Sequence, residues 1–331
     1  MSASTSLKTN NMTIKDHLHW VLNSPNLIMG ESSPFALVEP PSASDIDRVS
    51  QISEAELARH LSKTKSHFLG SYFEALWQFY LLHSSRYELI ASNLQFHHQG
   101  KTLGELDFIV YDHQCDRAIH QEIAIKFYLG TTANLANESE NLDGHWVGPN
   151  AIDRLDLKIN HLSKKQLPLA THPAVKERLE QLHISKLSSQ ALIKGYLFQP
   201  ALHEKVPTSQ YINPGHLSGV WYRVGELIEH IHDENLKENI WFKLEKSQWI
   251  SSDQTLARHT ESALALNDMI AFLSNTAHQQ RAHMFATFKV IGGSLKCGEK
   301  VFVVPNDWPT PHSAPALQAA SMNNQHPRTR R

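Results

Sequence analysis

Charged residues interrupt two otherwise apolar stretches of the sequence, LGELDFIVYD and AIHQEIAIKFYL. Asp107 lies in the first stretch, and Glu122 and Lys126 lie in the second. Segments this apolar are normally buried, and a buried charge needs a partner charge or a metal ion. Two carboxylates and a lysine are also groups that hold a divalent cation and stabilise charge on a phosphate. These residues therefore form the candidate site.

The two stretches predict a β-hairpin whose turn is the polar link at residues 112–117. Pairing that is symmetric about this turn places Asp107 opposite Glu122, with their Cβ atoms about 5 Å apart. Two facing carboxylates repel each other unless a proton or a cation joins them. This register therefore predicts a divalent metal between them. A slip of two residues would instead place Asp107 opposite Ala124 and loosen the pair.

Oxygen ligands without clustered cysteines favour Mg²⁺ or Mn²⁺ as the metal. Side chains alternate along a strand, so Lys126 shares a face with Glu122 and would help to position an attacking water. Arg154 and Lys158, in a predicted basic helix, would contact nucleic acid. The alternative is an ion pair of Lys126 with Glu122 or Asp107 and no metal, and spacing alone does not favour either interpretation.

A helix predicted over residues 67–82 supplies a further acid. Beside its apolar stripe runs a second stripe with Gly70, Ser71 and Glu74, whose small residues allow close approach to other backbone. Glu74 would then point into a packed interface. The simpler alternative is that Glu74 is exposed or accepts a hydrogen bond from a nearby amide. The other elements predicted around the hairpin are a strand, a helix and a strand, at 87–96, 153–167 and 191–198.

Composition limits the classes of protein that the chain can belong to. The 331 residues carry a net charge of −2 with a pI of about 6.9, so nucleic-acid binding would need a local basic patch. Two cysteines exclude a disulfide framework and fit a reducing compartment. The sequence has no apolar run of membrane-spanning length and no signal peptide, so we expect a cytoplasmic protein without a membrane partner.

The chain is expected to divide into five segments. They are a disordered N-terminus, a helical extension, the core with the hairpin, a mixed α/β C-terminal region packed on that core, and a disordered basic tail, at 1–12, 13–63, 64–200, 201–308 and 309–331. The C-terminal region holds four widely spaced tryptophans, which favour core anchors over a nucleic-acid stacking surface: Trp221, Trp241, Trp249 and Trp308.

The order of these elements resembles the PD-(D/E)xK nuclease superfamily, whose core is an αβββαβ unit with a central mixed sheet. More closely, the chain resembles the bacterial family catalogued as domain of unknown function 1853. The segments that carry this resemblance cover most of the chain: HWVLNSPNLI, FLGSYFEALWQFYL, GELDFIV, EIAIKFYL, GPNAIDRLDLK and VFVVPNDWP.

The resemblance implies an α/β fold with a restriction-endonuclease-like core over about residues 64–200. It implies catalytic positions at Asp107, Glu122 and Lys126. It also implies a metal held by Asp107, Glu122 and Glu74. Lys158 falls where that superfamily often carries a polar or basic residue on its second core helix.

The chain departs from the superfamily pattern at Ala124, where an acid normally stands two residues before the lysine. Glu122 keeps the correct strand face but lies about 6–7 Å further along the strand. Two hypotheses follow. One is a Mg²⁺-dependent nuclease that hydrolyses phosphodiesters in DNA or RNA. The other is a non-catalytic module that binds nucleic acid or protein on a nuclease-like fold with an incomplete metal site.

Overall fold

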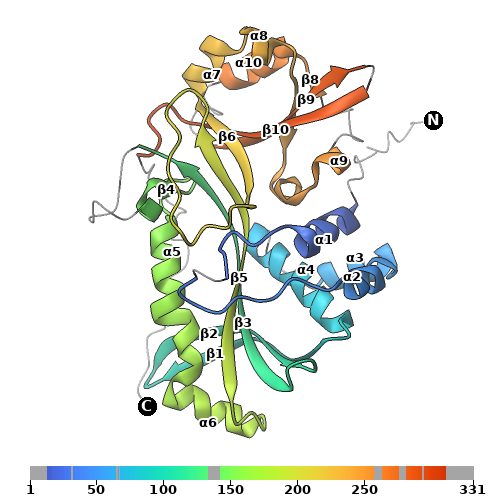
Figure 1. Ribbon diagram of the computed structural model, residues 1–331, viewed down its shortest axis with the longest axis vertical. Coiled ribbons are helices and arrows are strands. Elements are labelled where there is room, and N and C mark those ends of the chain that lie inside the picture. The colour runs from blue at the N-terminus through green and yellow to red at the C-terminus, as the bar shows by residue number, and fades with distance from the viewer. Residues whose placement is uncertain are drawn as a thin grey trace, which may run out of the picture.

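One large mixed β-sheet forms the backbone of the molecule (Figure 1). The computed structural model describes residues 13–30, 33–64, 66, 68–132, 142–256, 263–275, 281–292 and 294–310. In this part of the chain the sheet has ten strands in the order β1-β2-β3-β5-β6-β10-β9-β7-β8, with β4 paired to β3. The strands are β1 Tyr87–His98, β2 Lys101–Asp112, β3 Arg117–Gly130, β4 Trp146–Val147, β5 Leu187–Pro200, β6 Leu217–Arg223, β7 Ile240–Leu244, β8 Ala263–Leu264, β9 His283–Ile291 and β10 Ser294–Val304.

Strand direction changes along the sheet. β1, β2 and β3 are antiparallel neighbours, whereas β3, β5, β6 and β10 run parallel to one another. Strands β9, β7 and β8 complete the sheet with antiparallel pairs. The structure therefore has the α/β architecture with a central mixed sheet that the sequence predicts.

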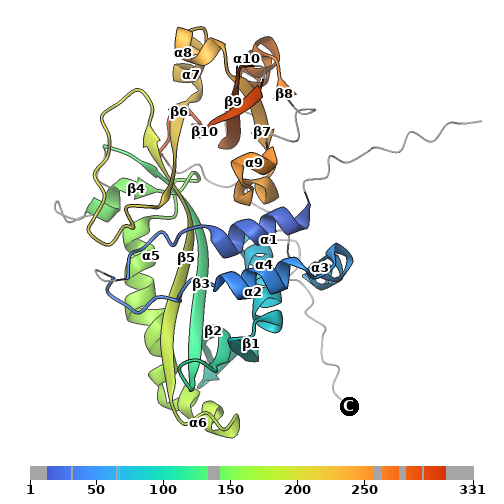
Figure 2. The same ribbon diagram turned by 45° about the vertical axis from the view of Figure 1, so that its right-hand side comes forward.

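Helices cover both faces of the long strands β3 and β5 (Figures 1 and 2). On one side lie α1 Ile14–Asn23, α2 Ala43–Ser50, α3 Glu54–Leu61 and α4 Leu69–His83. On the other side lie α5 Leu155–His161, the π-helical turn η2 Leu162–Gln166, the 3₁₀ turn η3 Leu167–Thr171 and α6 Pro173–Gln181. The shorter elements are η1 Leu142–His145, α7 Val224–His230, α8 Glu234–Lys237, η4 Lys246–Ile250, α9 Asp253–Leu256 and α10 Leu266–Ser274.

Strand β3 separates two apolar cores. Ile123 and Phe127 lie in the core formed with α1 and α4, as their alternation along the strand predicts. Tyr128 lies on the opposite side, against Leu155 and Ile159 of α5. The charged residues on the α5-facing side of β3 therefore lie at the interface between that helix and the sheet.

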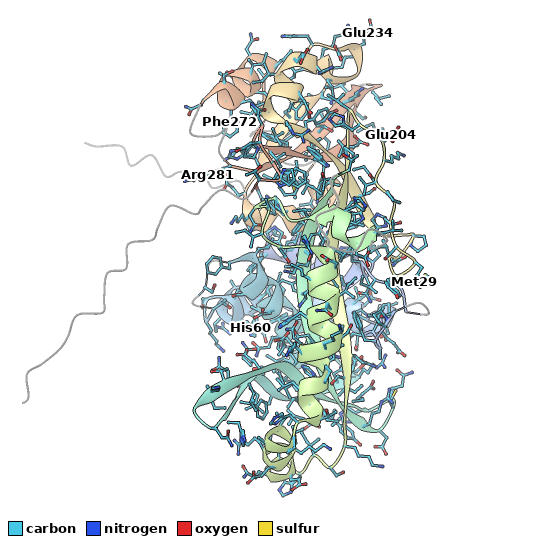
Figure 3. The ribbon with its side chains drawn as sticks, turned by 90° about the vertical axis from the view of Figure 1, so that its left-hand side faces the viewer. Met29, His60, Glu204, Glu234, Phe272 and Arg281 are labelled. Atoms are coloured by element: carbon cyan, nitrogen blue, oxygen red, sulfur yellow. The ribbon has the colours of Figure 1, made fainter. Side chains whose placement is uncertain are left out.

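The sheet continues without a break from β5 into the C-terminal strands. Figure 3 shows this C-terminal region at the upper end of the view, where Glu234 and Phe272 are labelled. Three of its tryptophans, Trp221, Trp241 and Trp308, are buried, and the partly buried Trp249 packs against the main core. The interpretation of these residues as core anchors is confirmed. The five-segment division stays a prediction, and residues 1–12 and 311–331 lie outside the described residues.

The sequence predicts irregular connections at residues 30–45, which carry three prolines, and at residues 130–150, which are polar and carry Gly144, Gly148 and Pro149. The structure forms short elements in both. Helix α2 begins at Ala43 inside a stretch with three prolines that predicted an irregular connection, because Ser42 caps the helix by accepting a hydrogen bond from Asp45. The sequence does not predict strands β6 and β7, whose short segments lack a strict alternation of buried and exposed residues. The predicted loop at 130–150 contains η1 and β4, and residues 133–141 of it lie outside the described part.

Candidate metal and nucleic-acid site

The hairpin of β2 and β3 positions the candidate site. Asp112 pairs with Arg117 as the turn predicts, and the ladder continues to the pair of Phe108 and Gln121. This register is confirmed, and the two-residue slip is excluded. The ladder ends there, so Asp107 lies one residue beyond the last ladder pair.

The Asp107 side chain binds the neighbouring strand at this position. Its Oδ2 accepts a hydrogen bond of 2.9 Å from the backbone N–H of Ile123. The carboxylate thus occupies the place of a main-chain acceptor, next to Glu122. Because Ile123 follows Glu122 in the chain, this bond makes Asp107 and Glu122 neighbours across the two strands. A metal held between them stays a prediction.

The surroundings of this pair disfavour two negative charges. Burial, and then the charge of Glu122, raise the pKa of Asp107 to about 7. Burial also raises the pKa of Glu122 to about 7, although Lys158 and the contact with Asp107 oppose the rise. At neutral pH the pair therefore has a strong tendency to retain a proton or to bind a cation.

Glu122 contacts three further side chains. Its Oε1 accepts a hydrogen bond from Nε2 of Gln166 and lies 3.9 Å from Nζ of Lys158. Its Oε2 lies 3.7 Å from Nε2 of His120, and among the residues that the structure describes neither of these two buried atoms has a hydrogen-bond partner. Burial lowers the pKa of His120 to about 4, so the ring is neutral near pH 7.

The tautomer of His120 follows from its other contact. Ser189 donates its hydroxyl to the carbonyl of Leu167 at 3.0 Å, so Nδ1 of His120 donates to Ser189 Oγ at 3.2 Å. Nε2 then carries a lone pair directed toward Glu122. His120 stands two residues before Glu122 in the sequence, so the alternation of side chains along β3 places both on the same strand face.

Glu74 lies further from the pair. It is partly buried on α4, and burial, followed by the charges of Asp107, Glu105 and Glu122, raises its pKa to about 7. With Gln78 and other polar residues it lines a hollow of about 340 Å³. In the part of the chain that the structure describes, no three His, Cys, Asp or Glu residues are arranged to hold a metal ion. The metal role of Glu74 stays a prediction.

Lys126 forms an ion pair with Asp153, with 2.5 Å between Nζ and Oδ2. The structure therefore pairs Lys126 with Asp153, and not with Glu122 or Asp107 as the ion-pair alternative predicts. Gly195 on β5 packs against the backbone of Lys126 so closely that a Cβ there would lie 1.6 Å from the Lys126 carbonyl oxygen. Its φ of +141° also favours glycine.

The two residues expected to contact nucleic acid have different environments. Lys158 is 12% exposed beside Glu122, and burial lowers its pKa, while the charge of Glu122 opposes that change. Arg154 forms a bidentate ion pair with Asp156, at 2.9 and 2.8 Å. Lys158 therefore belongs to the carboxylate site, whereas Arg154 is held at the start of α5.

These features define an α/β protein with a pair of largely buried carboxylates just beyond the end of the ladder of β2 and β3. The sequence model of a family described as a domain of unknown function, DUF1853, matches residues 16–304. The chain belongs to this family, in agreement with its sequence motifs. No curated protein and no solved structure matches the chain. No helix in the described part has both the length and the apolar character needed to span a membrane.

Proposed function

We propose that this protein is a divalent-metal-dependent phosphodiesterase that hydrolyses DNA or RNA. The observation that carries the proposal is the pair of Asp107 and Glu122. The two side chains come from neighbouring strands just beyond the end of the ladder of β2 and β3, and burial raises the pKa of each to about 7. Perturbed acids in a mutually repelling pair are typical of functional sites rather than of structural ion pairs.

The order of elements supports a PD-(D/E)xK-like core for this activity. Helix α4 is followed by the antiparallel strands β1, β2 and β3, then by α5, and then by β5, which lies parallel to β3. This order corresponds to the αβββαβ unit of that superfamily. Asp107 and Glu122 lie on its second and third strands, where the superfamily places its acids.

The donor set fits a small divalent cation. Glu122 Oε2 is buried without a hydrogen-bond partner in the described part of the chain, and Asp107 Oδ2 accepts the backbone N–H of Ile123. Mg²⁺ commonly uses one or two carboxylates together with water and substrate phosphate, so a third acidic side chain is not required. Asp107 and Glu122 would hold Mg²⁺ or Mn²⁺, whose chemistry there is polarisation of the phosphodiester and acidification of water.

The residues of the chain around the pair have definable roles. The backbone N–H of Ile123 fixes the orientation of Asp107, and Gln166 fixes that of Glu122. Lys158 lies beside Glu122, and Lys126 stands four residues after Glu122 on the same strand face. An ammonium group at the site would stabilise charge that develops on a phosphate. Burial beneath α5 limits the access of water and strengthens these interactions.

Cleavage assays test the proposal. Labelled single-stranded, duplex and branched DNA and RNA are incubated with the full chain and Mg²⁺ or Mn²⁺. We expect at least one substrate to be cut, and Asp107→Asn or Glu122→Gln to slow the cut by about 100-fold or more. Glu105→Gln is the matched control, because Glu105 lies two residues from Asp107 and bonds Gln95 instead. A wild-type protein that cuts nothing, or an Asp107→Asn variant that cuts equally well, contradicts the proposal.

A second candidate is a non-catalytic module that binds nucleic acid or protein. Ala124 at the usual acid position and the absence of a three-ligand group among the described residues favour it. A module of this kind would bind an oligonucleotide or a protein partner but would not bind Mn²⁺, so a calorimetric titration with Mn²⁺ would show no heat of binding. Binding that is unchanged in Asp107→Asn, together with no heat from Mn²⁺, would select this candidate over the nuclease.

A further inference from the structure

The two lysines that could serve the carboxylate site, Lys126 and Lys158, differ in their contacts. Lys126 is 26% exposed, and its Nζ lies 2.5 Å from Oδ2 of Asp153, a side chain that is 36% exposed. Lys158 is only 12% exposed, and its Nζ lies 3.9 Å from Oε1 of Glu122. The ammonium group that borders the carboxylates comes from α5 and not from β3.

Gln166 holds this arrangement together. Its Oε1 accepts hydrogen bonds of 2.9 Å from both Lys158 Nζ and His161 Nδ1, while its Nε2 donates to Glu122. One amide thus connects the lysine to the carboxylate. An ammonium group has three N–H donors, so the bond to Gln166 leaves donors for a phosphate oxygen.

The π-helical turn η2 explains how Gln166 reaches this position. Lys158 and Gln166 are eight residues apart, and eight residues of α-helix make about 2.2 turns, which would separate the two side chains by roughly 80° around the axis. A π-helix has i→i+5 bonds, so each residue advances by a smaller angle. The five π-helical residues that end at Gln166 therefore bring it back toward the face of Lys158.

We propose that Lys158, rather than Lys126, is the lysine of the site that contacts the scissile phosphate, and that Gln166 is its positioning residue. This inference rests on the proposed phosphodiesterase function. It relocates the lysine of the site from the third core strand to the second core helix. Lys126 then serves to join β3 to the segment before α5 through Asp153.

Two readouts on Lys158→Met and Lys126→Met test the assignment. The first is the affinity for a labelled oligonucleotide, measured by fluorescence anisotropy in Ca²⁺, and the second is single-turnover cleavage in Mn²⁺. We expect Lys158→Met to weaken binding about tenfold and to slow cleavage about 100-fold. For Lys126→Met, the loss of affinity and the loss of cleavage rate should each be less than about a tenth of the corresponding loss for Lys158→Met. Lys165→Met is the charge-matched control, because Lys165 is exposed on the same π-helical turn.

The outcomes separate this inference from the proposed function. Losses that are larger for Lys126→Met than for Lys158→Met, or equal losses for Lys158→Met and Lys165→Met, overturn the assignment. If the wild-type protein binds the oligonucleotide but cuts nothing, the phosphodiesterase proposal fails, while the binding readout still decides which lysine contacts phosphate. Urea unfolding of each variant identifies a loss that reflects misfolding, and Lys158→Arg, which keeps the charge, should then recover most of the binding.

A double-mutant cycle tests the role of Gln166. If Gln166 acts by holding Lys158, Gln166→Ala weakens oligonucleotide binding in the wild-type background but has no further effect in the Lys158→Met background. A purely structural role of Gln166 would give additive losses. Additive losses with native unfolding behaviour overturn the positioning role.

Discussion

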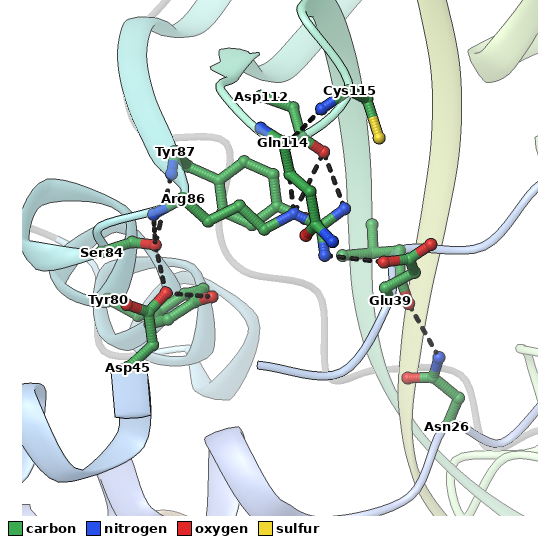
Figure 4. Close-up of polar contacts among 11 residues, drawn as sticks. Asn26, Glu39, Asp45, Tyr80, Ser84, Arg86, Tyr87, Asp112, Gln114 and Cys115 are labelled. Atoms are coloured by element: carbon green, nitrogen blue, oxygen red, sulfur yellow. Dashed lines mark hydrogen bonds and ion pairs between the residues drawn. The ribbon is translucent and has the colours of Figure 1, made fainter. Parts of the chain in front are cut away.

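Strand β2 carries one aspartate at the turn end of its ladder with β3 and another just beyond the open end, and the two have opposite environments. Asp112, at the turn, has no solvent exposure and faces Arg86, whose Nε lies 3.1 Å from both carboxylate oxygens and whose Nη2 lies 2.7 Å from Oδ2 (Figure 4). Backbone N–H groups of Gln114 and Cys115 also donate to it. Asp107, at the open end, receives one backbone bond and faces another acid.

The pKa values follow these contacts. Burial alone would raise the pKa of Asp112, but the hydrogen bonds from Arg86 and from the turn amides lower it below its usual value. The same holds for the buried Asp45, which receives hydrogen bonds from Ser84 and Tyr80 (Figure 4) and from Ser85. At Asp107 burial is not offset in this way. A buried acid with enough donors is structural, whereas one that lacks donors still requires a proton or a cation.

The largest effect is expected at the turn. Arg86→Met leaves Asp112 buried without its cation, and we expect the free energy of unfolding to fall by about 3 kcal/mol. Urea unfolding at pH 7, followed by tryptophan fluorescence, measures this change. Arg48→Met, on the exposed face of α2, is the control and should change stability by less than about 0.5 kcal/mol. A loss at Arg86 no larger than at Arg48 would remove the distinction between the two ends.

The same substitution should have opposite signs at the two aspartates. Asp107→Asn removes a carboxyl that ionises against burial and Glu122, so the free energy of unfolding should rise by about 2 kcal/mol at pH 8 without metal. Asp112→Asn removes a carboxylate that binds Arg86 and should lower it by a similar amount. Two losses of equal size would show that Asp107 is also a structural acid.

The pH dependence gives a smaller but sharper distinction. The folded pKa of Asp107 is raised from 3.8 to about 7, so the folded state binds more protons between these values and loses stability as pH rises. The advantage of Asp107→Asn should therefore appear between pH 4 and 7 and vanish at pH 4. The folded pKa of Asp112 is lowered, so its contribution should persist from neutral pH down to about pH 4 and be lost below it. Unfolding series of both variants at several pH values measure these windows.

The sequence predicts the hairpin well because its information is local. The symmetric turn fixes the register, which the pairing of Asp112 with Arg117 confirms. The partner of Lys126 is not local, since it depends on where the chain before α5 packs. Gln166 could not be assigned either, because its position requires a π-helical turn for which the sequence has no clear signal.

The central claim is that Asp107 and Glu122 together bind a divalent cation, and a calorimetric titration of the full chain with Mn²⁺ at pH 7.5 tests it directly. We expect one site in the wild-type protein and in Glu105→Gln, and no measurable binding in Asp107→Asn or Glu122→Gln. Binding of Mn²⁺ to Asp107→Asn with the wild-type affinity, or no binding to the wild-type protein, would contradict the claim.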